Sequence, residues 1–233
     1  MKNIFFIATI VCSLCFIISC KKENNIEPEN IVQNVAPIDS TASYKIIITG
    51  TWASPQQRIP PNEHFTQFIG LIHSNECAVY TLGALASKGV ENVAEIGNST
   101  VLKREMDSLI SLNKALAKFF LTIPGIVGKD STNISVNIKN ARISFESMLA
   151  PTPDWFVGLD SYNLIQNGKW IDDITIPIYG YDAGTEDADV FGYANPATVP
   201  QQPISLMTPA NASVIANGNI LIAPFASLRI VKL

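Results

Sequence analysis

The stretch MLAPTPDWFVGLDSYNLIQNGKWIDDITIPIYGYDAGTED, residues 148–187, places two apolar runs around a turn signal. Asn167-Gly168 is typical of a two-residue β-hairpin, because both residues tolerate the positive φ of a type I′ turn. On either side, residues 155–160 and 174–179 alternate as half-buried strands do. We therefore predict a long hairpin in which the numbers of paired residues sum to 335.

Four carboxylates gather at the far end of this predicted hairpin. Residue 154 falls opposite residue 181, so Asp154 and Asp182 meet there, and Glu186 and Asp187 follow just beyond. Directly opposed Cα atoms are about 4.5–5.5 Å apart, and like charges at that range repel unless something neutralises them. A hard cation with oxygen ligands, calcium above all, would do so, with backbone carbonyls completing the coordination. We predict one calcium ion held by Asp154, Asp182 and Glu186, with Asp187 as the alternative to Glu186.

The same carboxylates allow an interpretation without a metal. Asp182-Ala-Gly-Thr is also the pattern of an Asx turn, in which the aspartate side chain accepts a backbone N–H two residues further on. Asp154, which follows Pro153, can act in the same way. Spacing alone leaves both interpretations open.

Four sequence blocks carry a resemblance to a known family. In order along the chain they are HFTQFIGLIHS (64–74), ASKGVENVAEIG (86–97), PTPDWFVGLDSYNL (151–164) and GKWIDDITIPIYGYDAGTED (168–187). Together they resemble the spondin-type N-terminal domain of F-spondin and mindin, over residues 44–233. The resemblance implies an extracellular β-sandwich that binds calcium and mediates adhesion, and in which an inserted helix is expected.

The remaining segments predict further strands and one helix. Strands are expected at residues 44–52 and 220–233, and a second hairpin joins residues 133–138 to 141–149. Apolar residues recur at helical spacing between Leu102 and Phe120. We predict an all-β fold, an antiparallel β-sandwich of about eight strands with one inserted helix at about residues 100–120. Pro177 cannot donate to a ladder, so its strand should lie at an edge or contain a bulge.

The N-terminus resembles the targeting segment of a bacterial lipoprotein. Lys2 precedes an apolar run at residues 4–18, which is too short for a comfortable membrane span and ends in Ile-Ile-Ser-Cys. We expect a signal peptide at residues 1–19, a lipid anchor on Cys20, a flexible linker at residues 20–42 and one sandwich domain at residues 43–233. An ordinary cleaved signal and a short anchor helix are the alternatives.

Composition excludes several classes of function. The chain has 233 residues and a formal net charge of −4, with no basic stripe, so a nucleic-acid partner is not expected. The sequence contains no HExxH, GxSxG or P-loop motif. We expect His73 to make a structural hydrogen bond, and Cys77 to be buried and inert.

Three functions are compatible with these patterns. The first is a non-catalytic, calcium-stabilised adhesion or ligand-binding module with an unknown protein or glycan ligand. It would be tethered by lipid to the cell envelope, at the outer membrane, on the periplasmic or the surface-exposed face. The second is an accessory polymer- or glycan-binding lipoprotein of an uptake system, marked by exposed aromatic residues such as Trp52 or Trp170. The third is a hydrolase that uses the carboxylates as general acid and base. The sequence favours the first.

Overall fold

A computed structural model describes residues 37–53, 59–188, 191–207 and 223–233 of the chain. The described residues from Ile38 to Leu233 belong to one compact unit. The predicted signal peptide, Cys20 and most of the predicted linker lie outside the described residues.

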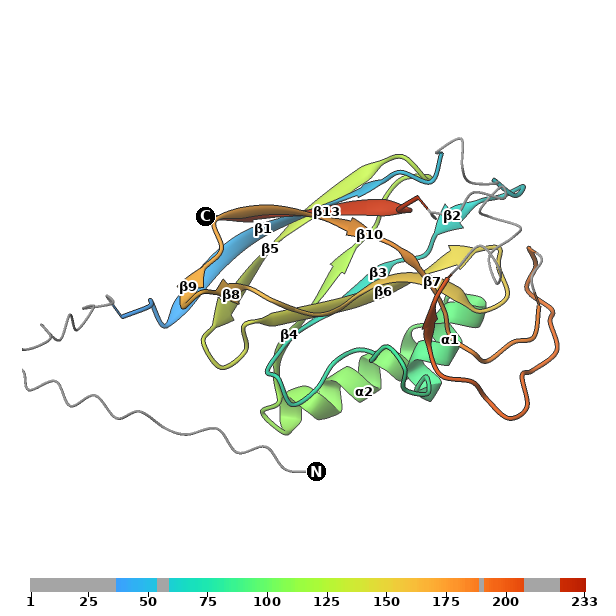
Figure 1. Cartoon of the computed structure of the whole chain (residues 1–233), viewed down its shortest axis with the longest axis horizontal. Helices are drawn as coiled ribbons and strands as arrows, with labels where there is room; N and C mark the ends of the chain where they lie inside the picture. The colour runs from blue at the N-terminus through green and yellow to red at the C-terminus, as the bar shows by residue number, and fades with distance from the viewer. Residues whose placement is uncertain (1–36, 54–58, 189–190, 208–222) are drawn as a thin grey trace, which may run out of the picture. The chain divides into compact units, whose positions relative to one another are not determined.

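Two antiparallel sheets form the sandwich, which confirms the predicted fold class (Figure 1). The first sheet has the order β10-β13-β1-β5 and consists of β1 (Thr41–Gly50), β5 (Lys129–Asn137), β10 (Asp173–Ile178) and β13 (Ala226–Lys232). The second has the order β12-β11-β7-β6-β3-β4, with β2 paired to β6. Its strands are β2 (His64–Phe65), β3 (Phe68–His73), β4 (Ala115–Leu121), β6 (Arg142–Ala150), β7 (Trp155–Asn163), β11 (Gly180–Asp182) and β12 (Ser205–Leu206).

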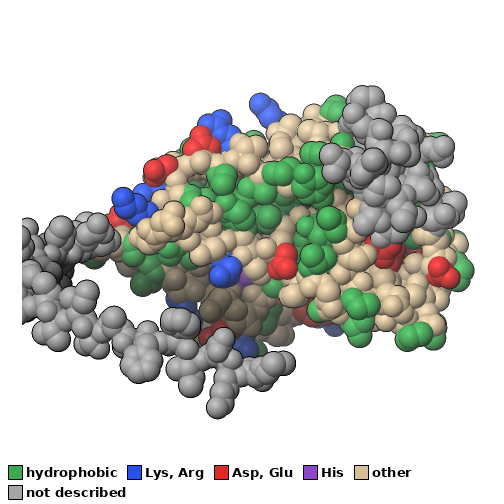
Figure 2. Space-filling model, viewed as in Figure 1, with side chains coloured by type: hydrophobic (Ala, Val, Ile, Leu, Met, Phe, Trp, Pro, Cys, Tyr) green, Lys and Arg blue, Asp and Glu red, His purple; other side chains and the backbone are tan. Residues whose placement is uncertain are grey.

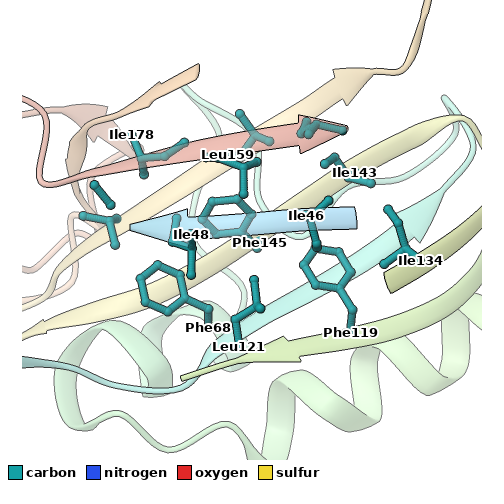
Figure 3. Packing of buried hydrophobic residues seen from close by; sticks show 14 of the residues in the cluster. Ile46, Ile48, Phe68, Phe119, Leu121, Ile134, Ile143, Phe145, Leu159 and Ile178 are labelled. Atoms are coloured by element: carbon teal, nitrogen blue, oxygen red, sulfur yellow. The ribbon is translucent and has the colours of Figure 1, made fainter. Parts of the chain in front are cut away.

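The main core lies between these sheets and follows from the period-two pattern of the strands. On β1, the side chains of Tyr44, Ile46 and Ile48 are fully buried, whereas the residues between them are at least partly exposed. Figure 3 shows Ile46 and Ile48 packed among aromatic side chains of the second sheet, including Phe68 and Phe145. This packing fixes which face of each strand points inward.

The predicted long hairpin exists only next to its turn. Asn167 and Gly168 have positive φ values of 51° and 72°, and they join β8 (Ile165–Gln166) to β9 (Lys169–Trp170) in the predicted register. Beyond β9 the chain crosses to the first sheet, where β10 pairs with β13 instead of β7. The prediction was wrong here because alternation shows which side of a strand is buried but not which sheet it joins. β10 is nevertheless an edge strand, as Pro177 predicted.

The second predicted hairpin is also wrong. β5 pairs with β1 in the first sheet, whereas β6 pairs with β3 and β7 in the second. The short segment between β5 and β6 therefore connects the two sheets instead of turning back within one. Both strands have an apolar face because both contribute to the core between the sheets.

Two helices cover the outer face of the second sheet, α1 (Lys88–Ile96) and α2 (Thr100–Ser111). The prediction contained no helix at α1, which Ser87 caps by accepting the Val90 N–H and which Gly97 ends in the left-handed conformation. The predicted helix at residues 100–120 was too long. Asn113 has a positive φ of 56°, and residues 115–121 then form β4. Leu116 and Phe120 fit a helical spacing but are partly exposed residues of that strand.

Candidate functional site

The predicted acidic cluster lies where β7 begins and β11 ends. Asp182 pairs with Trp155, and the Ala183 N–H donates to the carbonyl oxygen of Asp154 over 3.1 Å. Paired residues here sum to 337 instead of the predicted 335. Asp154 and Asp182 are therefore neighbours, as predicted, although a separate short strand brings them together and not one continuous hairpin.

The Asp154 carboxylate organises the turn that follows β11. The side chain is fully buried, and its Oδ2 accepts hydrogen bonds from the Thr185 N–H at 2.7 Å, the Thr185 hydroxyl at 3.2 Å and the Glu186 N–H at 3.1 Å. Its Oδ1 is buried and has no hydrogen-bond partner among the described residues. Burial, together with the nearby charge of Asp182, raises the pKa of Asp154 to about 6, although the three hydrogen bonds oppose this shift.

Asp182 makes the Asx turn that the sequence allowed. Its Oδ1 accepts the Gly184 N–H at 2.8 Å. Gly184 has a φ of 71°, and a Cβ on it would lie 2.2 Å from the carbonyl oxygen of Gln202, so only glycine fits this turn. Burial raises the pKa of Asp182, and the Gly184 N–H and the Trp155 side chain partly offset that effect.

Glu186 and Asp187 continue the same loop. The Asn195 side-chain amide donates to Oε2 of Glu186 at 2.9 Å, and the Asp187 N–H donates to the carbonyl oxygen of Pro196 at 2.8 Å. Burial raises the pKa of Glu186. Both residues line a surface hollow of about 520 Å³ together with Asp182. Asp154 is not among the residues that line this hollow; it lies against the turn through its bonds to Thr185 and Glu186.

The donor set suits calcium in kind, since every candidate side chain offers carboxylate oxygens. The buried Oδ1 of Asp154 is an acceptor for which the described residues supply no donor. As they stand, however, no three acidic, His or Cys side chains of the described residues are grouped closely enough to hold a metal. The Asx-turn interpretation is therefore correct for Asp182 and wrong for Asp154, whose Oδ2 accepts N–H groups more than thirty residues away in the sequence. In both aspartates the other carboxylate oxygen stays free of these bonds.

Comparison with known proteins identifies the family. The Spondin_N family model matches residues 42–217, well over half of the chain. This chain belongs to the Spondin_N family. It is 29% identical to Spondin-2 of Rattus norvegicus and 28% identical to Spondin-2 of Homo sapiens, in each case over 79% of this chain and 58% of the relative. It is 30% identical to Spondin-1 of Gallus gallus over 72% of this chain and 22% of that relative. The chain therefore spans little more than half of the Spondin-2 proteins.

Four other residues of this Spondin_N chain were singled out from the sequence, and three of them lie in the interior of the sandwich. His73 is fully buried, its Nδ1 lies 2.6 Å from the carbonyl oxygen of Ser74, and its Nε2 lies 2.7 Å from the Ser144 hydroxyl. Burial lowers the pKa of His73, so the imidazole is a neutral structural group, as expected. Trp52 and Trp170 are only 0% and 6% exposed, so the expectation of exposed aromatic residues was wrong. Both pack against core aromatic rings because they belong to the sandwich interior.

Cys77 is half-buried, whereas the sequence analysis expected it to be buried. Its thiol donates to the carbonyl oxygen of Lys114. Burial raises the pKa of this thiol, which agrees with the expected low reactivity. Among the described residues, no helix is both long enough and apolar enough to cross a membrane. On the face shown in Figure 2, acidic and basic side chains are interspersed and form no basic stripe.

One buried carboxylate of the Spondin_N domain was missed by sequence reasoning. Glu146 on β6 is fully buried, and neither of its carboxylate oxygens has a hydrogen-bond partner among the described residues. In RISFESMLA, alternation places Ser144, Glu146 and Met148 on the strand face away from the main core. That face would be exposed in a bare sandwich, so only knowledge of both helices would have revealed the burial of Glu146.

Proposed function

We propose that this Spondin_N chain is a lipid-anchored protein of the cell envelope that carries a non-catalytic adhesion or ligand-binding module stabilised by one calcium ion. Family membership supports the module, and the Ile-Ile-Ser-Cys junction supports the anchor. The observation that carries the calcium proposal is the buried Oδ1 of Asp154, which has no donor among the described residues and lies beside the half-buried Asp182.

Asp154, Asp182 and Glu186 would hold the ion, with Asp187 as the alternative to Glu186. Bound calcium would supply positive charge to a cluster whose carboxylates otherwise repel one another. The protein's part is to hold the loop in place through the Thr185 and Glu186 N–H groups, which donate to Asp154.

A melting curve in millimolar calcium and in chelator tests this site. Binding to the folded state alone adds roughly 2.7 kcal/mol when free ion is a hundredfold above its dissociation constant, which raises Tm by about 5–11 °C for a domain of this size. Asp182→Asn should abolish most of this rise, because it removes a charge and keeps the shape. Asp173→Asn is the matched control, since Asp173 pairs with Arg229 on the exposed face of the first sheet.

If calcium leaves the wild-type Tm unchanged, the calcium proposal is wrong and the interpretation without a metal is supported. A rise that Asp173→Asn removes as fully as Asp182→Asn would show that the ion binds elsewhere. In either case the family assignment and the sandwich would stand.

Membrane attachment is tested by replacing Cys20 with Ser in the full-length chain and fractionating the cells. We expect the wild type in the membrane fraction with lipid on Cys20, and the variant released from it, because acylation anchors a protein without a spanning helix. If the variant stays with the membrane in the same proportion and mass spectrometry finds no lipid on the wild type, the anchor proposal is wrong.

The alternative functions have less support. A polymer- or glycan-binding role was linked to exposed aromatic side chains, but Trp52 and Trp170 are buried. A hydrolase would need its carboxylates free to transfer protons, whereas Oδ2 of Asp154 is engaged by three donors of the turn. That the protein is not an enzyme stays a prediction.

A further inference from the structure

The acidic turn, residues 182–187, is held from one side by a second segment of the chain. The Thr198 N–H donates to the carbonyl oxygen of Thr185 at 2.8 Å, and Glu186 and Ala197 form an antiparallel bridge. The two segments therefore run side by side. This pairing fixes the backbone position of Glu186 but leaves the direction of its side chain undetermined.

Asn195, just before this bridge, holds the Glu186 side chain. Its Nδ2 donates to Oε2 of Glu186 at 2.9 Å and to the carbonyl oxygen of Gly192 at 3.3 Å. An amide nitrogen has two N–H donors, so one can serve each oxygen. Within the described part of the chain, no residue donates to Oε1 of Glu186. One carboxylate oxygen is thus held by the protein, and the other stays open to a ligand.

The neighbouring Asp187 has no such support. Its N–H donates to the carbonyl oxygen of Pro196 at 2.8 Å, but the residue is exposed, and its carboxylate accepts no hydrogen bond from the described residues. Ordering a side chain when a ligand binds costs conformational entropy, and a side chain that is already held avoids part of this cost. Of these two adjacent acids, only Glu186 has its side chain oriented in advance.

We propose that Asn195 is a positioning residue of the calcium site, which orients the Glu186 carboxylate before the ion binds. This inference rests on the proposed calcium function, and Asn195 itself is not a ligand in it. Residues that hold a metal ligand through a hydrogen bond typically contribute about 10–100-fold to metal affinity. Because Asn195 holds one oxygen of one ligand, Asn195→Ala should weaken calcium binding about tenfold.

Calcium titration of the full-length chain, purified in detergent, measures this loss by isothermal calorimetry. The matched control is Gln166→Ala, which removes a side-chain amide that donates to the Tyr162 hydroxyl at 3.0 Å, beyond the other end of β7. The Kd for calcium should rise about tenfold in Asn195→Ala and stay at the wild-type value in the control. If the wild type binds no calcium, the proposed function fails and this inference fails with it. If the wild type binds calcium and Asn195→Ala binds it equally or more tightly, only the positioning role is wrong.

A shortened acid separates positioning of Glu186 from a general effect on the loop. Glu186→Asp keeps the charge but draws the carboxylate back by about 1.5 Å, which takes the 2.9 Å contact with Asn195 beyond hydrogen-bond range. In this background Asn195→Ala should leave the Kd unchanged, because the bond that it removes is already lost. A further loss of about tenfold in the double variant would show that Asn195 acts through its bond to the Gly192 carbonyl, and would overturn the proposal.

Discussion

Asp154, at the start of β7, and Glu146, in β6, are both fully buried acids of the second sheet, but their surroundings differ. Oδ2 of Asp154 accepts three hydrogen bonds from Thr185 and Glu186, and its Oδ1 has no partner among the described residues. Neither oxygen of Glu146 has a partner among the described residues. A carboxylate surrounded by backbone donors can stay charged in the interior, whereas one without donors is kept protonated by burial.

The neighbours of Glu146 include a glycine on β7 and the tyrosine that packs over it. It is opposed on β7 by Gly158, and a Cβ at Gly158 would lie 2.7 Å from the ring and hydroxyl of Tyr80. The Tyr80 hydroxyl is also buried, and its hydrogen-bond geometry to the other described residues is not favourable. Burial, and then the charge of Glu105 on α2, hold the pKa of Glu146 well above its usual range. The two helices thus enclose an acid that the sheet alone would leave in water.

Removing the Asp154 carboxylate should have the largest effect on stability. Asp154→Ala leaves the Thr185 and Glu186 N–H groups without their acceptor in a buried turn, and each such loss costs about 1–3 kcal/mol. We expect the free energy of unfolding to fall by roughly 2–5 kcal/mol in urea titrations without calcium. Asp154→Asn keeps an acceptor oxygen and should lose less than half as much. Equal losses for the two variants would show that the charge, and not the acceptor, holds the turn.

Replacing Glu146 should have the opposite effect on the free energy of unfolding. Glu146→Met removes an unpaired buried carboxyl and keeps a similar volume, so we expect a gain of about 1–3 kcal/mol in the free energy of unfolding at neutral pH. Destabilisation by Glu146→Met would mean that Glu146 has a bonding partner, and the contrast with Asp154 would fail.

Stability should also depend on pH through Glu146. Because the folded-state pKa is raised, the folded protein holds this proton more tightly than the unfolded chain does. The contribution is fully present below the unfolded pKa of about 4.3 and is lost as pH rises towards the folded pKa. Urea titrations across this range should show wild-type stability declining relative to Glu146→Gln, whose amide does not titrate. Parallel curves for the two proteins would show that Glu146 ionises as readily when folded as when unfolded.

The same contrast shows what the sequence could and could not predict. Asp154 and Asp182 were found because a hairpin turn and a DAGT motif are local signals, and the two residues meet although the intervening strand joins the other sheet. That crossing was not predictable from alternation, since Ile174 and Ile178 would be buried equally well in either sheet. The end of α2 was missed for a related reason, because Leu116 and Phe120 match a helical period by position alone.

The burial of Glu146 could not be predicted from its neighbours in the sequence. Its neighbours in RISFESMLA describe an ordinary strand with one solvated face. Its burial depends on the layer that covers the outer face of the second sheet, where residues of α1 and α2 such as Val90 and Leu102 pack with Ile69 and Phe156 of that sheet. A charged residue on the outer face of a strand is therefore informative only once the layers above it are known.

The smallest predicted effect separates the two causes of the raised pKa of Glu146. Burial is the larger cause and the charge of Glu105 the smaller. Glu105 also holds α1, since its Oε1 accepts the Gly89 N–H at 2.9 Å and its Oε2 accepts the Ser87 hydroxyl at 2.7 Å. Glu105→Gln removes the charge but keeps an oxygen acceptor, so we expect stability to change by less than about 0.5 kcal/mol at acidic pH. In Glu105→Gln, stability should still decline as pH rises, but the total decline should be slightly smaller. Glu146→Gln should instead remove the part of the decline that Glu146 contributes. If Glu105→Gln flattens the curve as fully as Glu146→Gln does, charge repulsion governs Glu146 and burial does not. The difference between the two buried acids would then lie in their charged neighbours instead of in the donors around them.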